Sequence, residues 1–293
     1  MTLLTYIING ISLGSVYAII ALGYTMVYGI AKMLNFAHGD IIMVGAYISY
    51  FAATSFGMPP LVCIAVSMAA CTVLGIAIER FAYRPLRNAN SLAVLITAIG
   101  VSYLLQNGAQ LLWTSNPKMY ASLIDIPALH LFDGRLTITG SALVTVISCV
   151  IVMALLVLIT KKTKVGKAMR AVSEDKEAAQ LMGINVNATI SLTFAIGSGL
   201  AAVAGALLCS QYTSLTPYTG AMPGIKAFVA AVFGGIGSIP GALIGGLLLG
   251  VIENLSKAYI SSQMADAIVF SVLIIVLLVK PTGILGKKIN EKV

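Results

Sequence analysis

Charged residues are scarce in this 293-residue chain, in which Asp, Glu, Lys and Arg together make up 10% of the sequence. Ordinary soluble domains carry about 25% of these residues. Hydrophobic residues, by contrast, reach 59%. This balance excludes a typical soluble enzyme or binding domain and indicates a membrane protein.

Residues that build catalytic or metal centres are also few. The two histidines, His38 and His130, belong to no Ser/His/Asp or Cys/His pattern. The four cysteines form no CxxC pair and lie in or beside apolar stretches, so we interpret them as packing residues. They are Cys63, Cys71, Cys149 and Cys209. We therefore expect no catalytic residue, no metal site and no enzyme activity.

The sequence also has no phosphate-binding loop. The nearest string, GILGKK at 283–288, has the wrong spacing for G-x-x-x-x-G-K-[ST] and lacks the hydroxyl that holds magnesium. We expect no cofactor in this chain, and any ATP and magnesium would have to bind to another polypeptide. The first eight residues contain no Lys or Arg, so we expect a retained first helix rather than a cleaved signal peptide.

Long hydrophobic runs dominate the rest of the chain, and several approach or exceed the ~20 residues that cross a bilayer as a helix. Their lengths show no strand-period alternation, which favours helices. The sequence predicts an all-α, polytopic membrane helix bundle of about eight to nine membrane segments, forming one transmembrane domain over 1–293. The clearest runs are 3–31, 35–56, 60–78, 91–113, 141–160, 189–209 and 266–280.

Positive charge gathers beside the ends of these runs. The formal net charge is +8, and most basic residues fall within 80–87, 161–176 and 280–292. Such patches mark cytoplasmic loops, whereas the loop at about 114–140 has balanced charges and is expected outside. We predict an external N-terminus and a cytoplasmic C-terminus. Because the patches are separate and lack interleaved aromatics, nucleic-acid binding is the poorer explanation.

Residues 224–258 combine apolar halves with helix breakers, among them Gly235, Gly237 and Pro240. A broken membrane helix is tolerated where its backbone is buried in protein or lines a polar cavity, and in transporters such breaks mark substrate paths. Small residues suited to close helix packing follow at Gly241, Gly245 and Gly246. The two interpretations can coexist, and the number of crossings within this region stays open.

The segment at about 161–188 is the most charged internal part of the chain. Ser173-Glu174-Asp175 predicts a helix start, and Gly183 predicts its end, which gives a short helix over about 174–182. Ala178, Leu181 and Met182 share one face of that helix. The segment is either a solvated loop helix or a small apolar knob offered to a cytoplasmic partner.

Residues 177–183 match the EAA-x3-G core of cytoplasmic loops in ABC importer permeases, although the following I-x-L-P element is absent, because Thr193 stands where proline is expected. Longer blocks widen the resemblance in the expected order. The chain resembles the LivH type of branched-chain amino-acid permease on NFAHGD (35–40), ERFAYRPLR (79–87), TAIGVSYLLQN (97–107), GKAMRAVSEDKEAAQLMGIN (166–185), MPGIKAFVAAVFGGIGSIPGALIGG (222–246) and KPTGILG (280–286).

This resemblance implies an inner-membrane subunit that imports leucine, isoleucine and valine. It implies pairing with a LivM-type second permease, LivG- and LivF-type ATPases that bind ATP and magnesium, and a periplasmic substrate-binding protein. The ATPases would dock on a coupling element made of Glu177, Ala178, Ala179, Leu181, Met182 and Gly183.

Ionisable residues within membrane segments are costly and are therefore functional candidates. Asp40 is expected near a helix entrance, where it favours the helix N-terminus, with capping favoured over a pair with His38. Lys226 is expected to extend to the interface, Glu253 to pair with Lys257, and Gln106 and Asn107 to bond between helices. We place the translocation pathway at Asn35, His38, Asp40, Gly235, Gly237 and Pro240.

Other functions remain compatible with these features. An ABC permease for another small solute, such as other amino acids, amides or urea, would carry the same docking segment. An ion-coupled secondary carrier would need acids in a relay, for which Asp40 and Glu253 are the candidates. A channel or scaffold would leave the capped helix without a role.

Overall fold

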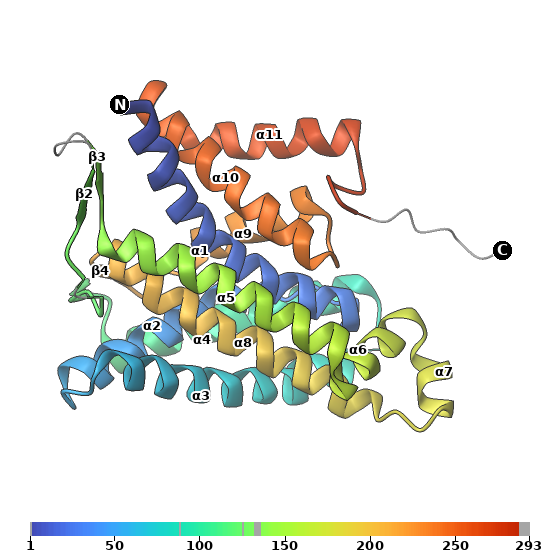
Figure 1. The fold of residues 1–293 in the computed structure, drawn as a ribbon. Helices are drawn as coiled ribbons and strands as arrows, with labels where there is room; N and C mark the ends of the chain where they lie inside the picture. The colour runs from blue at the N-terminus through green and yellow to red at the C-terminus, as the bar shows by residue number, and fades with distance from the viewer. Residues whose placement is uncertain (1, 88, 125, 132–135, 287–293) are drawn as a thin grey trace.

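The computed structural model describes residues 2–87, 89–124, 126–131 and 136–286, and within them the chain folds into a bundle of eleven α-helices (Figure 1). The helices are α1 (Thr2–Ala31), α2 (His38–Thr54), α3 (Pro60–Ile78), α4 (Ser91–Trp113), α5 (Gly140–Lys162), α6 (Lys164–Glu174), α7 (Lys176–Leu181), α8 (Val186–Gln211), α9 (Ala221–Gly234), α10 (Ile239–Tyr259) and α11 (Ala265–Val279). The predicted hydrophobic runs therefore form helices within a few residues of their expected bounds. Lys287, Lys288 and Lys292 of the third basic patch lie outside the described residues.

Six of these helices are long and apolar enough to cross a membrane, namely α1, α3, α4, α5, α8 and α10. Two shorter apolar helices, α9 and α11, bring the candidate spans to eight. The predicted all-α polytopic bundle is confirmed. Helix α2 has 17 residues and begins with His38 and Asp40, which lower its hydropathy. It is nevertheless enclosed by α3, α8 and α9.

Helices α1 and α8 form the centre of the bundle. Most of α8 is buried, and α1 packs against α5, α8, α9 and α10. Helices α3, α4 and α5 lie at the periphery and expose apolar side chains such as Leu61, Leu111 and Ile151. In a bilayer this apolar outer surface faces lipid, so the fold keeps its polar side chains toward the central helices.

The predicted break separates α9 from α10 at residues 235–238. Gly235 and Gly237 adopt φ values of 108° and 90°, which L side chains rarely tolerate. Pro240 stands in the first turn of α10, and the Ser238 hydroxyl accepts from the Gly241 amide at 3.2 Å. The packing glycines are present too, because a Cβ on Gly246 would lie 2.5 Å from the Ala18 Cα. The break and the close packing therefore coexist.

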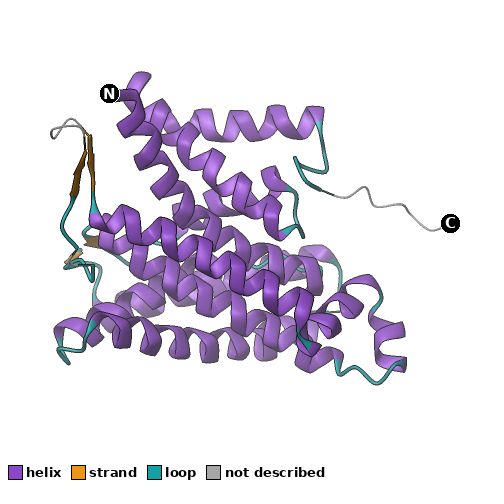
Figure 2. Cartoon of the chain, viewed as in Figure 1, coloured by secondary structure: helices purple, strands orange, loops and turns teal. Residues whose placement is uncertain are grey.

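Apart from the helices, the fold contains short strands, which lie in the connections at one end of the bundle (Figure 2). The loop that follows α4 contains β1 (Lys118–Met119), β2 (Leu129–Leu131) and β3 (Leu136–Ile138). Strand β1 pairs with β4 (Ser214–Leu215), which follows α8, and β2 pairs with β3. The hydroxyl of Tyr120 lies 2.8 Å from that of Ser49, which ties the loop to α2. Asp125, Asp133 and Arg135, on which its expected charge balance depends, lie outside the described residues.

A buried ionic cluster joins the last three helices to α1. The fully buried Glu253 accepts from Lys226 at 2.8 Å, from Lys257 at 2.6 Å and from the Tyr17 hydroxyl at 2.8 Å. Lys226 also lies 2.6 Å from Asp266 at the start of α11. The predicted pair of Glu253 with Lys257 is confirmed. The expected extension of Lys226 to the interface is wrong, because two carboxylates hold its ammonium inside the bundle.

Candidate functional site

The proposed docking segment folds as two helices rather than one. Helix α6 covers the basic half, where Met169 and Val172 are buried against the bundle while Lys167 and Arg170 stay exposed. Asp175 then leaves the helical region, with φ −153° and ψ 115°, and caps α7. The predicted start at Ser173 is therefore wrong, because Ser173 and Glu174 complete the last turn of α6.

Helix α7 has well-formed ends. The Asp175 carboxylate accepts from the amides of Glu177 and Ala178, both at 2.9 Å, and so satisfies backbone groups that a helix start leaves free. At the other end Gly183 adopts φ 81°, as predicted, and its amide donates to the Gln180 carbonyl at 3.0 Å. Six residues are too few to form a stable helix alone, so these two caps fix its shape.

The side chains of α7 divide into an inner and an outer set. Ala179 is buried against the bundle, while Ala178 is exposed. The side chains of Leu181 and Met182 are 89% and 83% exposed. The predicted apolar knob is thus present, and within the described chain nothing covers it. A knob of this kind is suited to a hydrophobic recess on another polypeptide.

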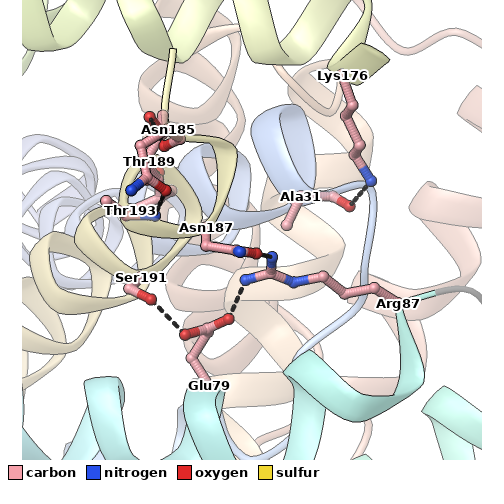
Figure 3. Close-up of polar contacts among 10 residues, drawn as sticks. Ala31, Glu79, Arg87, Lys176, Asn185, Asn187, Thr189, Ser191 and Thr193 are labelled. Atoms are coloured by element: carbon pink, nitrogen blue, oxygen red, sulfur yellow. Dashed lines mark hydrogen bonds and ion pairs between the residues drawn. The ribbon is translucent and has the colours of Figure 1, made fainter. Parts of the chain in front are cut away.

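Beneath α7 lies a polar cluster that the sequence did not reveal. The Lys176 ammonium donates to the Ala31 carbonyl at 3.2 Å, at the end of α1 (Figure 3). Glu79, fully buried after α3, pairs with Arg87 and accepts from Ser191 on α8. The Arg87 guanidinium also donates to the Asn187 side chain. These contacts join α7 to the end of α1, and the segment after α3 to the start of α8.

This cluster opens into a cavity of about 660 Å³ between α7, the start of α8 and the segment after α3. That segment consists of a π-helix, η1 (Glu79–Tyr83), and a 3-10 turn, η2 (Arg84–Leu86). Burial lowers the pKa of Lys176, and the neighbouring charges of Arg87 and Lys32 lower it further. The cavity is therefore a positively charged recess.

The predicted pathway residues divide into two groups, one at the break between α9 and α10 and one, His38 and Asp40, at the start of α2. Asn35 lies beside a narrow gap, too small for a water molecule, that is also lined by Tyr24, Tyr28, Phe228 and Ile236. Ile236 belongs to the break between α9 and α10. The structure thus brings Asn35 to the break, and Gly235 and Gly237 flank Ile236. Pro240 lies beyond it in the first turn of α10.

Two buried polar atoms of the predicted pathway residues, on Asn35 and His38, have no hydrogen-bond partner among the described residues. The Asn35 side-chain oxygen, Oδ1, accepts from the Tyr83 hydroxyl at 2.9 Å, but the side-chain nitrogen, Nδ2, is unpaired. The buried His38 stacks edge-on against Tyr24, with ring centroids 4.6 Å apart, and its Nε2 is unpaired. An unpaired buried donor or acceptor is costly, so its presence suits a group that meets a passing ligand.

Asp40 differs from its expected role. It lies in the first turn of α2, but α2 has no side-chain cap, and the carboxylate accepts from Gln106 on α4 at 2.8 Å. The predicted interhelical bond of Gln106 is therefore confirmed. That of Asn107 is wrong, because its amide donates within α4 to the Tyr103 carbonyl at 2.8 Å and its side chain is exposed.

A bundle with eight candidate spans and an exposed, capped interhelical segment defines a polytopic membrane protein. Residues 6–278 match the family model described as the permease component of branched-chain amino acid transport systems. The chain belongs to this family, as the sequence blocks indicated. It is the permease of a branched-chain amino acid ABC transport system, a transport subunit rather than an enzyme. The family assignment replaces the carrier and channel alternatives.

The relatives extend over nearly the whole chain. The high-affinity branched-chain amino acid permease protein LivH of Salmonella typhimurium is 46% identical, covering 97% of this chain and 96% of its own. The corresponding BraD protein of Pseudomonas aeruginosa is 45% identical over 99% and 98%. Among solved structures, PsaBC from Streptococcus pneumoniae in complex with Fab is similar over 94% of this chain and 91% of that chain, with a TM-score of 0.49 and 13% identity.

Proposed function

We propose that this permease imports leucine, isoleucine and valine across a bacterial inner membrane, driven by separate ATPase subunits that dock on α7. The observation that carries the proposal is the capped helix with its exposed Leu181 and Met182. LivG- and LivF-type ATPases hold the ATP and magnesium, a periplasmic binding protein delivers the substrate, and a LivM-type permease completes the membrane pair.

The orientation follows from the placement of charge. Helix α7 lies at the end of the bundle where α11 also finishes, whereas the N-terminus and the β2–β3 hairpin lie at the other end (Figure 1). Exposed basic residues lie at the α7 end, where Arg80 follows α3 and Lys161 and Lys162 end α5. By the positive-inside rule that end is cytoplasmic, so the N-terminus is periplasmic and α11 leads to a cytoplasmic C-terminus.

The closed gap beside Asn35 is the candidate gate. Tyr24, Tyr28 and Phe228 supply apolar and aromatic surface for an aliphatic side chain, and the unpaired Asn35 amide is a donor for a substrate carboxylate. Gly235 and Gly237 leave backbone groups at the break between α9 and α10, where transporters commonly meet polar substrate groups. In this arrangement the path is shut, and ATPase movement opens it.

The second permease contacts the outward face of α4. A Cβ added at Gly100 or Gly108 would meet nothing within 4 Å, so this face has no packing partner within the described chain. Asn107 is exposed on the same helix, and a polar amide is disfavoured against lipid. Small residues and an amide together suit close contact with another membrane helix.

Replacement of Leu181 by Asp tests the docking assignment. A charge on the exposed knob would have to be buried unpaired in the ATPase recess, so we expect ATP-dependent leucine uptake to be abolished and the ATPases to be lost from the purified complex. Uptake of labelled leucine in vesicles and co-purification measure the two effects. The membrane level of the variant should equal that of the wild type, because the Leu181 side chain is 89% exposed.

Val165→Asp is the matched control, since Val165 is an exposed apolar residue on α6 that lies away from the α7 knob. It introduces the same charge into the same charged segment, and we expect it to retain uptake and ATPases. Normal uptake by Leu181→Asp would refute docking on α7. Competition of uptake by isoleucine, valine, other amino acids and urea then defines the substrate range.

A further inference from the structure

The cavity beside α7 carries positive charge that the described chain does not neutralise. Arg84, Arg87 and Lys176 line it from two different segments. Of these, Arg87 forms an ion pair with Glu79, whereas neither Arg84 nor Lys176 has an acidic partner among the described residues. The Arg87 Nε is buried without a partner in that part of the chain as well. Lys32 adds a further charge near Lys176.

The start of α8 adds to this field. Asn185, Val186 and Asn187 line the cavity, so the first turn of the helix faces it. The Asn185 side chain accepts from the Ala188 amide at 3.0 Å, and Val186 and Asn187 are the first two residues of the helix. A helix start carries partial positive charge from its free N–H groups. Three cationic side chains and a helix start around one space of about 660 Å³ suit an anion larger than a single carboxylate.

The cavity lies at the level where the membrane surface is expected. The hydrophobic part of α3 ends at Ile78, α1 ends at Ala31 and α8 begins at Val186, all beside the recess. Phe81, in η1 between Arg80 and Arg84, is 78% exposed. An exposed aromatic ring just beyond the end of an apolar helix is typical of a segment at the bilayer interface, where the ring lies among the acyl chains.

We propose that this cavity binds the phosphate headgroup of an anionic phospholipid. Basic pockets between helices at the cytoplasmic surface are a recognised form of such sites. The phosphate meets Arg84, Lys176 and the first turn of α8, while the acyl chains lie along Phe81. Gln180 of α7 and Gly183, just after the helix, line the same cavity, so the bound lipid holds the docking segment against the membrane. The lipid site goes beyond the ATPase docking proposal and does not depend on it.

Arg84→Gln tests the site, because Arg84 is exposed and its loss leaves the Glu79 to Arg87 pair intact. The assembled complex is purified in neutral detergent and titrated with phosphatidylglycerol, phosphatidylcholine or inorganic phosphate, with retained lipid measured by native mass spectrometry. We expect wild type to retain phosphatidylglycerol over phosphatidylcholine. Arg84→Gln should weaken that retention about fivefold, and Arg84→Lys should restore most of it.

Arg80→Gln is the matched control, since Arg80 is an exposed arginine of the same segment that does not line the cavity. It should retain the lipid as wild type does. Equal weakening by both variants would mean a diffuse surface charge and would overturn the site. Saturation by inorganic phosphate without lipid preference would overturn the lipid source. Loss of ATPase subunits from Arg84→Gln with unchanged lipid retention would assign the cavity to a partner carboxylate instead and overturn the proposal.

Leu181→Asp separates this proposal from the docking assignment. That variant leaves the cavity unchanged, so phosphatidylglycerol should remain bound even though the ATPases are lost. Lipid retention by Leu181→Asp with loss in Arg84→Gln would support both proposals. Loss of lipid in Leu181→Asp would show that the ATPases, rather than the cavity, hold the lipid, and would overturn the lipid site alone.

Discussion

At the residue scale, the buried charges are where this chain is most easily damaged. Glu253 is fully buried and accepts three hydrogen bonds, and Lys226 joins it to Asp266. The attraction within such a cluster only offsets the cost of removing its charges from water. Its main consequence is therefore that Lys226, which contacts both carboxylates, cannot be removed without leaving their charge poorly compensated.

Lys226→Met should destabilise the permease by about 3–5 kcal/mol, because it removes a buried partner from both Glu253 and Asp266. Denaturation of the purified protein, followed by helix content, measures the loss. Lys257→Met is the control. Lys257 binds the same carboxylate, but its side chain is 36% exposed, so its loss should cost about 1 kcal/mol or less. Equal losses in the two variants would contradict the central role assigned to Lys226.

Some residue roles were within reach of the sequence and others were not. The pair of Glu253 with Lys257 follows from a spacing of four on one helix, and the left-handed Gly183 follows from its place after an apolar turn. The contacts of Lys226 with Glu253 and of Gln106 with Asp40 join residues 27 and 66 positions apart. Only tertiary packing decides such partners, so local reasoning had no basis for choosing them.

At the scale of the elements, hydrophobic length located the spans well because the bilayer fixes it. The 91–113 and 60–78 runs coincide with α4 and α3. Helix α6 escaped notice because its charges suggested only a topology marker, although the apolar Met169 and Val172, three positions apart, lie on one helical face. The gap lined by Asn35 and Ile236 could not be predicted, because it forms between distant segments.

Gly108→Leu tests the outward face of α4. A Cβ added there meets nothing within 4 Å in the described chain, so the stability of the isolated permease should not fall. If the second permease packs against this face, the added side chain separates the two helices and should weaken their association by about tenfold or more, since overpacking costs about 1–3 kcal/mol. Co-purification of the two permeases at rising detergent concentration measures the change.

Ala69→Leu provides the control for that variant, because Ala69 is exposed on α3 and the change adds similar bulk to another peripheral helix. It should leave the association unchanged. If Gly108→Leu also leaves the pair intact, the α4 face contacts lipid rather than the second permease. The exposed Asn107 would then stay as an unexplained polar group against hydrocarbon.

At the scale of the whole molecule, a continuous set of contacts runs from the docking helix to the break. Lys176 at the start of α7 donates to the Ala31 carbonyl at the end of α1. Two residues earlier, a Cβ on Gly29 would lie 3.3 Å from the Gly237 Cα. Ile236 and Tyr28 line the closed gap beside Asn35. We propose that movement of α7 reaches the gap through the end of α1.

Lys176→Met removes the first contact of this route while keeping the length of the side chain. The α7 knob is unchanged, so we expect the ATPases to stay bound and to hydrolyse ATP, while leucine imported per ATP falls by about fivefold or more, the usual range of coupling between sites. Transport and hydrolysis measured together in proteoliposomes give this ratio. Lys164→Met, at an exposed lysine of α6, should leave it unchanged.

Arg84→Gln alters the same cavity but keeps the bond to Ala31, so a normal ratio there separates coupling from lipid binding. A normal ratio in Lys176→Met would show that α7 drives the gap by another route, and loss of the ATPases would place Lys176 in docking rather than in coupling.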